Sequence, residues 1–290
     1  MPSFNKSSDQ AGHLRRLARH LVPRARVLTL VSGKGGVGKS NIAANMSLCL
    51  AAAGRSVVLV DADLALANLD ILFDLRPTIN LAHLLKAPLN PAEITKVIAP
   101  GLRLLPGASG LTTLTDLSDY HQTQVIQILE TLERNADFLV VDASAGLSSN
   151  VLAFAAAADE VLVVTTPEPT AVTDAYAVMK VLIVERQVPN ISLVVNMAKS
   201  AQQVRLIHSR LAGAARRFLD YELPLAGSVS QDRHVPQAVS DRQPFVWSSP
   251  RCRASRQVRR LARNFLAGPS RTGFARPQQR YFARAASLFV

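Results

Sequence analysis

The chain has 290 residues, of which 48% are hydrophobic and 19% charged, a composition typical of a soluble globular protein with a sizeable core. No run of about 18 or more uncharged apolar residues occurs, which argues against a membrane-spanning helix. Cys49 and Cys252 are the only cysteines, which suits a reducing cytoplasm and excludes a disulfide framework.

The formal net charge of +12 is unevenly distributed along the chain. Residues 1–26 carry six basic residues and one acidic residue, and residues 251–290 carry ten arginines and no acid. The intervening part has 17 basic and 20 acidic side chains, so it is a mildly acidic globule. Basic ends on such a globule indicate contacts with anionic surfaces or acidic partners, and direct binding of nucleic acid is not expected.

Near the start of the chain, Leu14, Leu17, Ala18 and Leu21 recur at helical spacing, which predicts a helix with an apolar stripe. The first ten residues lack the basic-then-apolar layout of a secretory signal, so secretion is not expected. From these residues alone, the simplest expectation is a surface helix that packs on the chain's own domain.

Apolar runs rich in Val and Leu predict strands, and helix-length segments separate them. Most runs are continuous rather than alternating, so both faces of each strand are expected to be buried. The predicted fold is therefore α/β, a doubly wound and mostly parallel sheet of about seven to eight strands flanked by helices, with ligand chemistry at the carboxyl ends of the strands. The predicted strands span residues 26–33, 56–63, 101–107, 137–144, 159–167, 191–197 and 223–230.

The stretch VSGKGGVGKS, residues 31–40, follows the first strand and has the spacing Gly-x-x-x-x-Gly-Lys-Ser of a phosphate-binding loop. Glycines let backbone N–H groups surround phosphate oxygens, and the helix predicted over residues 40–54 adds its positive dipole. Lys39 is predicted to reach the outer phosphates of a nucleotide, and Ser40 to ligate Mg²⁺.

Acidic side chains follow two of the predicted strands. Asp61 and Asp63 lie two residues apart at one strand end, so they share a face. Like charges this close are unfavourable unless a cation or ordered water lies between them. Asp142 follows four apolar residues, which is the usual form of an aspartate on the Mg²⁺ side of NTPases with such loops. A cap on the following turn is the alternative role for Asp142.

The loop KGGVGKS resembles the deviant phosphate loop of the MinD/ParA class of P-loop ATPases. The resemblance implies that its extra lysine, Lys34, crosses a dimer interface to the phosphates of the other subunit, and that Lys34, Lys39 and Asp63 are catalytic. Asp63 would position the attacking water, whereas Asp61 and Asp142 would be outer-shell partners of Mg²⁺. The implied phosphate-binding residues are Gly33, Lys34, Gly35, Gly36, Val37, Gly38, Lys39, Ser40 and Asn41.

Stretches at residues 9–15, 106–110, 165–180 and 194–200 resemble the flagellar-number ATPases FlhG, also called FleN, and the likeness covers nearly the whole chain. The first, DQAGHLR, is the most diagnostic, because in that family it activates the partner GTPase FlhF, a protein of the signal-recognition-particle type. Glutamines orient hydrolytic water in other GTPases, and a donated glutamine could do so here. The implied GTPase-activating residues are Asp9, Gln10, Ala11, Leu14 and Arg15.

The same resemblance implies where adenine binds. Family members use an asparagine after a late strand, which Asn196 matches, and a loop that resembles residues 227–235. In that loop Val229 and Asp232 are the implied adenine neighbours. A turn at the strand end is the alternative role for Asn196.

The C-terminal region divides into two parts. Residues 248–268 place Val258, Leu261, Phe265 and Leu266 on one stripe and resemble the family's last core helix, so docking on the sheet is expected. The later part carries an apolar stripe flanked by arginines, which is typical of an interfacial membrane helix, and relatives use it to reach the inner membrane. Packing on the core or on a partner protein is the alternative. The predicted membrane-helix residues are Tyr281, Phe282, Leu288 and Phe289.

Two positions near the predicted hydrolysis machinery depart from the family. Ala65 stands where relatives commonly have glycine, and Ala143-Ser144 stands where they often have Thr-Gly or Ser-Pro. The lysines and aspartates are intact, so binding of ATP and Mg²⁺ and slow hydrolysis are expected, and the departures leave the rate open. A shared iron–sulfur cluster, found in relatives of the wider class, is not expected.

These features predict a GTPase-activating arm at residues 1–25, a MinD-like ATPase domain at 26–267 and an amphipathic membrane-targeting tail at 268–290. The implied function is an ATP-dependent dimerising switch that regulates flagellar number and placement, in the cytoplasm and reversibly at the inner membrane. The implied partners are a second copy of the chain, an FlhF-type GTPase, flagellar transcription activators and C-ring proteins. A MinD-like septum-site or ParA-like partitioning ATPase is the alternative.

Overall fold

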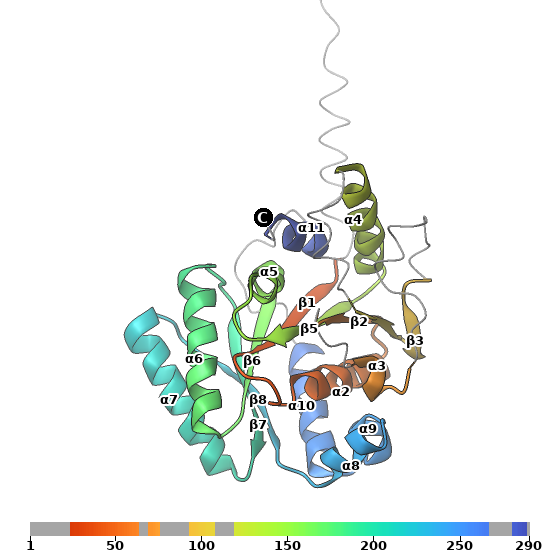
Figure 1. Cartoon of the computed structure of the whole chain (residues 1–290). Coiled ribbons are helices and arrows are strands. Elements are labelled where there is room, and N and C mark those ends of the chain that lie inside the picture. Colours follow the sequence, from red (N-terminus) through yellow and green to blue (C-terminus); the bar gives the residue numbers. More distant parts are fainter. Residues whose placement is uncertain (1–23, 64–68, 76–92, 108–118, 267–279, 289–290) are drawn as a thin grey trace, which may run out of the picture.

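The computed structural model describes residues 24–63, 69–75, 93–107, 119–266 and 280–288, and of residues 119–125 the backbone alone. Its centre is an eight-stranded sheet in the order β3-β4-β2-β5-β1-β6-β7-β8 (Figure 1). Every neighbouring pair is parallel except β3 and β4. The strands are β1 (Arg26–Ser32), β2 (Val57–Ala62), β3 (Lys96–Ala99), β4 (Leu102–Leu105), β5 (Phe138–Ala145), β6 (Glu160–Thr165), β7 (Ile191–Ala198) and β8 (Leu225–Ser230).

The strand predictions and the α/β fold class are confirmed, with one strand missed. Each predicted run contains a strand of the sheet, with ends that differ by up to two residues. The missed strand, β3, has only four residues, pairs antiparallel at the sheet edge and is partly exposed. A short edge strand does not need the continuous apolar run by which the buried strands were recognised.

Helices cover both faces of the sheet, so the domain has three layers (Figure 1). One face carries α2, α8, α9 and α10, and the other carries α4, α5, α6, α7 and α11. The helices are α2 (Lys39–Ala52), α3 (Leu69–Leu72), α4 (Asp119–Arg134), α5 (Ser149–Ala157), α6 (Pro169–Val184), α7 (Ala201–Leu219), α8 (His234–Ser240), α9 (Phe245–Ser248), α10 (Arg253–Leu266) and α11 (Tyr281–Ser287).

The central strand β1 shows why the strands read as continuous apolar runs. Leu28 and Leu30 pack in the core cluster that includes α2 and α10. Val27, on the opposite face, packs in the cluster that includes α4, α5 and α11. All three side chains are fully buried, so both faces of the strand carry apolar residues and the sequence does not alternate between apolar and polar.

Helix α10 docks on the sheet as the sequence predicts. Val258, Leu261 and Phe265 are buried in one cluster with strand residues, and Leu266 packs against that cluster. The guanidinium of Arg26 fixes the end of this helix, because it donates to the carbonyl of Phe265 at 2.9 Å and pairs with Glu160 at 2.8 Å.

The last helix, α11, is part of the core rather than an exposed amphipathic helix. Tyr281 is fully buried and Phe282 is 1% exposed, and both pack in the cluster formed with α4 and α5. The backbone N–H of Tyr281 donates to the buried carboxylate of Glu133 at 2.9 Å, which fixes the start of the helix. In this structure α11 therefore packs on the core, which was the alternative to membrane contact.

The prediction that Tyr281 and Phe282 face a membrane does not hold in this structure. An apolar stripe flanked by arginines can pack on a membrane surface or on a protein core, so the sequence pattern does not distinguish these two locations. Leu288 is partly buried against the same cluster, and Phe289 lies outside the described residues. In the described ranges no helix is both long and apolar enough to cross a membrane.

The predicted GTPase-activating residues lie outside the described residues, as does Ala65. They are Asp9, Gln10, Ala11, Leu14 and Arg15. The boundaries predicted at residues 25 and 267 fall next to the start of β1 at Arg26 and the end of α10 at Leu266.

Replacing Phe282 with alanine should lower the free energy of unfolding by about 3–5 kcal/mol, because a deleted buried phenyl ring leaves a cavity. Urea unfolding followed by circular dichroism measures the change. Phe218→Ala is the matched control, since that ring is 66% exposed on α7 and its loss should change stability by less than about 0.5 kcal/mol. Similar, small losses for the two variants would contradict the packing of α11.

Candidate functional site

The phosphate loop lies between β1 and α2, at the carboxyl edge of the sheet. Gly38 has φ +83° and directly precedes Lys39, the first residue of α2. Gly33 touches α6, where an added Cβ would lie 2.3 Å from the carbonyl oxygen of Asp174. Both glycines are therefore required, one for a left-handed backbone and one for a close approach.

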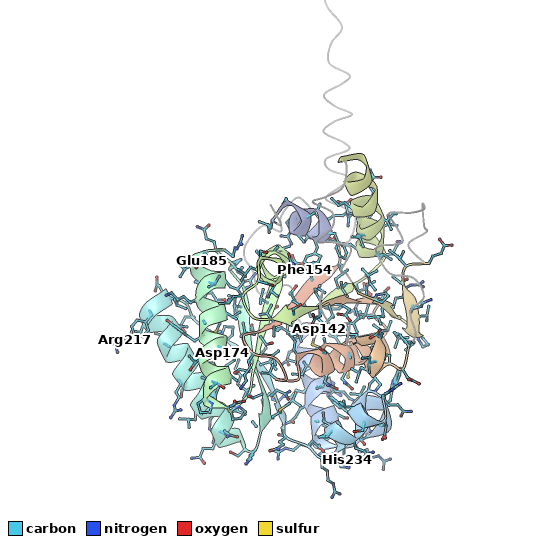
Figure 2. The ribbon with its side chains drawn as sticks, in the orientation of Figure 1. Asp142, Phe154, Asp174, Glu185, Arg217 and His234 are labelled. Carbon is cyan, nitrogen blue, oxygen red and sulfur yellow. The ribbon has the colours of Figure 1, made fainter. Side chains whose placement is uncertain are left out.

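Lys39 forms a buried ion pair across the sheet edge. Its ammonium lies 2.6 Å from Oδ1 of Asp142, in the second half of β5. Figure 2 labels Asp142 near the centre of the sheet. The loop lysine is therefore fixed on the neighbouring strand β5, and its contact with nucleotide phosphates stays a prediction.

Asp61 and Asp142 lie side by side on adjacent parallel strands, because β2 and β5 pair with these two residues in register. Both carboxylates are buried. Burial raises the pKa of Asp61 to about 7, and the nearby charge of Asp142 adds to the rise. Backbone N–H groups of Asp63 and Leu69 donate to the Asp61 carboxylate at 3.1 and 3.3 Å and act in the opposite direction.

Asp63 is held by a serine on the neighbouring strand β5. The hydroxyl of Ser144 donates to Oδ1 of Asp63 at 3.0 Å. Ser144 lies in β5, two residues beyond Asp142. The serine therefore orients the carboxylate predicted to position the attacking water.

Lys34 lies at the rim of the loop and is bound within its own chain. Its ammonium is 2.5 Å from Oε1 of Glu168 and 3.0 Å from the hydroxyl of Thr170. The hydrogen bond from Lys34 lowers the pKa of Glu168, and one from Thr170 adds to this. The Lys34 side chain is 38% exposed, so it is accessible to a second molecule.

Asn196 adjoins the loop from β7. Its Nδ2 donates to the carbonyl of Val37 at 2.7 Å, and an added Cβ on Gly38 would lie 2.4 Å from that nitrogen. The structure therefore brings Asn196 to the phosphate loop, and its contact with adenine stays a prediction. Val229 is buried in β8.

Asp232 binds the start of α10. Its Oδ2 accepts the backbone N–H of Ala254 at 3.1 Å. The contact of Asp232 with adenine stays a prediction.

Three buried oxygens at the loop edge have no hydrogen-bond partner among the described residues: Oγ of Ser32, Oδ1 of Asn41 and Oδ2 of Asp142. Unpaired buried acceptors are costly, and oxygen is the ligand that Mg²⁺ prefers. The residues present therefore fit Mg²⁺ bound together with nucleotide phosphates, with Ser40, Asp61 and Asp142 as the predicted metal site. When bound, the ion would neutralise charge on the phosphate oxygens.

A comparison with protein-family models matches residues 24–266 to ParA, described as NUBPL iron-transfer P-loop NTPase. The chain belongs to the ParA family of P-loop NTPases. The matched range contains the phosphate loop, the aspartates at the strand ends and Glu168. The MinD/ParA resemblance predicted from the loop is thereby confirmed.

Two curated relatives match most of the chain. The antiactivator FleN of Pseudomonas aeruginosa is 36% identical over 244 residues, covering 84% of this chain and 87% of the relative. The flagellum site-determining protein YlxH of Helicobacter pylori is 34% identical over 238 residues, covering 82% and 80%. These relatives agree with the predicted resemblance to FlhG (FleN).

A solved structure supports the fold. The septum site-determining protein MinD of Pyrococcus horikoshii, complexed with Mg-ADP, has a TM-score of 0.66 and 24% identity, covering 84% of this chain and 98% of that chain. At this identity the likeness shows the ParA-family fold alone.

Sequence reasoning assigned no individual role to Glu168, Thr170 or Ser144. Glu168 and Thr170 follow the end of β6, and Ser144 lies near the end of β5, so all three lie at the same sheet edge as the loop. A search for all polar residues near the carboxyl ends of the parallel strands, and not for aspartates alone, would have identified these three residues.

In protein free of nucleotide and metal, stability should fall as pH rises from about 4 to about 7, because folded Asp61 keeps a proton that the unfolded chain has lost. The stabilising contribution of protonated Asp61 is fully present at lower pH, and it is lost as the pH rises through the pKa that Asp61 has in the folded state. Asp61→Asn should remove this part of the slope, at most about 1.4 kcal/mol per pH unit. Urea unfolding at several pH values measures it, and parallel curves for both proteins would contradict the raised pKa.

Proposed function

We propose that this chain is an ATP-switched regulator of flagellar number and placement. The observation that carries the proposal is the 36% identity to the antiactivator FleN, which extends over 84% of the chain. The name of YlxH, a flagellum site-determining protein, gives further support.

Lys34 supplies the switch in this proposal. In the single chain its ammonium is paired with Glu168 at the rim of the loop. In a dimer, the phosphates bound by the other subunit would offer it more negative charge than one carboxylate does. ATP offers more such charge than ADP, so self-association would depend on which nucleotide is bound.

Hydrolysis would use residues already placed at this edge. Asp63, oriented by Ser144, would position a water in line with the γ-phosphorus. The water oxygen forms a new bond to phosphorus, the bond to the ADP oxygen breaks, and the water's protons remain on the released phosphate and its surroundings. Lys39, and Lys34 of the other subunit, would stabilise the charge that develops on the departing ADP and the transferred group.

ATP hydrolysis per molecule should increase with protein concentration, because each site is complete only in a dimer. Lys34→Ala should abolish this increase. Glu168→Gln should make the rate rise at lower protein concentration, because Lys34 is then released from its ion pair with Glu168. Asp63→Ala should reduce the rate at every concentration by roughly 10²-fold or more.

Phosphate release measured over a hundredfold range of protein concentration gives all four curves. A specific rate that does not depend on concentration in the unaltered protein would contradict catalysis in a dimer.

The flagellar assignment further predicts that the N-terminal arm stimulates an FlhF-type GTPase. A peptide of residues 1–26 should accelerate GTP hydrolysis by that GTPase, and Gln10→Ala in the peptide should remove most of the effect, because the glutamine orients the attacking water. Steady-state GTP turnover measures this, with a scrambled peptide as the control. No acceleration by the unaltered peptide would remove the support for this role.

A septum-site or partitioning ATPase is the second candidate. It is favoured by the 31% identity to the septum site-determining protein MinD of Synechocystis, over 76% of this chain. This candidate has no use for the DQAGHLR segment, so the peptide measurement separates the two. Inner-membrane association stays a prediction, and in this structure the side chains of Tyr281 and Phe282 are buried.

A further inference from the structure

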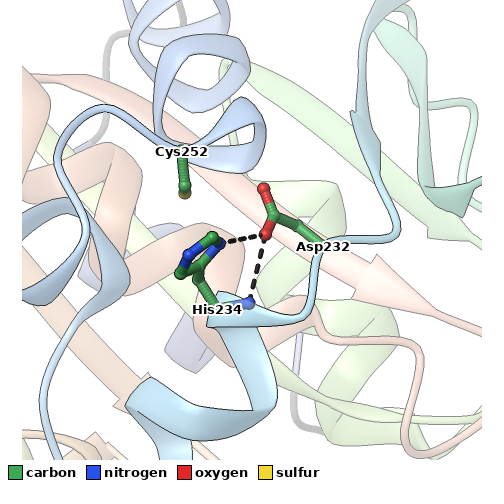
Figure 3. A group of neighbouring side chains, drawn as sticks. All are labelled: Asp232, His234 and Cys252. Atoms are coloured by element: carbon green, nitrogen blue, oxygen red, sulfur yellow. Dashed lines mark hydrogen bonds and ion pairs between the residues drawn. The ribbon is translucent and has the colours of Figure 1, made fainter.

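Three side chains with metal-ligating atoms meet away from the phosphate loop (Figure 3). Asp232 follows β8, His234 is the first residue of α8, and Cys252 directly precedes α10. Their ligand atoms, one from each residue, all lie within 4.8 Å of one another. In Figure 3 the thiol of Cys252 points toward the other two side chains.

The carboxylate of Asp232 is fixed from both sides of the cluster. Its Oδ1 accepts the backbone N–H of His234 at 3.1 Å and lies 2.7 Å from Nδ1 of that imidazole. Its Oδ2 accepts the backbone N–H of Ala254 at 3.1 Å. These hydrogen bonds order the carboxylate, and an ordered carboxylate oxygen is a good metal ligand.

The sulfur of Cys252 lies at the start of a long helix. Its Sγ accepts the backbone N–H of Ser255 at 3.3 Å and lies 3.2 Å from the hydroxyl of that residue. N–H groups at a helix start stabilise a thiolate, the form of cysteine that binds metals.

We propose that Asp232, His234 and Cys252 bind a divalent transition metal, with Zn²⁺ as the best match. Thiolate sulfur, imidazole nitrogen and carboxylate oxygen are all ligands of zinc, and the two negative charges balance a divalent ion. Bond lengths of about 2.0–2.3 Å place tetrahedral donors roughly 3.3–3.6 Å apart. To hold the ion, Oδ1 of Asp232 and Nδ1 of His234 would move apart from 2.7 Å, whereas a separation near the 4.8 Å limit would shorten by about 1 Å. The His234 side chain is 43% exposed, so its imidazole has room to rotate.

The metal would join the loop after β8 to the start of α10. That loop is anchored on β7, because the backbone N–H of Gln231 donates to the carbonyl of Ala198 at 3.0 Å. Ala198 lies two residues beyond Asn196, so the loop that carries Asp232 is tied to the strand whose Asn196 contacts the phosphate loop. Binding to the folded state alone also raises stability.

The direct test uses the full-length chain, stripped with a chelator and kept in excess Mg²⁺ without nucleotide. Co²⁺ is added as a spectroscopic stand-in for Zn²⁺, since a cobalt–thiolate bond gives a strong near-ultraviolet band. One equivalent should give the band, and one equivalent of Zn²⁺ should displace it. Competition against a chromophoric zinc chelator then gives the affinity.

Matched variants locate the site. Cys252→Ser should abolish the band, and His234→Asn should weaken Zn²⁺ binding by at least about tenfold. Cys49→Ser and His208→Asn should change neither, because His208 is instead bound to the carbonyl of Leu223. Circular dichroism confirms that each variant is folded. Absence of the band in the unaltered protein, or its persistence in Cys252→Ser, would overturn the proposal and leave these residues as a cap of α10.

Discussion

Two buried carboxylates, Asp61 and Asp142, lie side by side on adjacent strands, and among the described ion pairs only Asp142 has one, with the ammonium of Lys39. A buried carboxylate is stable only when it is paired, hydrogen-bonded or protonated. Asp142 is paired with Lys39, whereas Asp61 is the one whose pKa rises to about 7. The site is thus built to accept positive charge near its aspartates and negative charge near its lysines, and nucleotide with Mg²⁺ brings both.

The same principle of charge balance applies to Lys34 at the rim. The lysine is not left unpaired in the single chain, because Glu168 and Thr170 bind it. Pairing of an exposed lysine with an exposed glutamate is weak and screened by salt, so it can be exchanged for phosphates at modest cost. In the proposed switch, Glu168 holds the ammonium of Lys34 in an ion pair until another subunit presents the phosphates of a nucleotide.

Sequence reasoning recovered the parts of the molecule that local patterns determine. Fully buried strands need continuous apolar runs, and a phosphate loop needs its glycines and lysine at fixed spacing, so both could be recognised before the fold was known. Glu168, the partner of Lys34, lies after β6 and is 134 residues away, and Ser144, the partner of Asp63, lies in β5 and is 81 residues away, so only the sheet order brings these pairs together. The place of Tyr281 and Phe282 could not be predicted either, since their stripe fits a core and a membrane alike.

Light scattering coupled to size-exclusion chromatography tests the central claim most directly. With a non-hydrolysable ATP analogue and Mg²⁺ the chain should elute at twice the mass that it has with ADP or without nucleotide, and Lys34→Ala should stay at the single mass throughout. A single mass in the saturating analogue, or an equal dimer without nucleotide, would contradict a switch that joins each lysine to its neighbour's triphosphate.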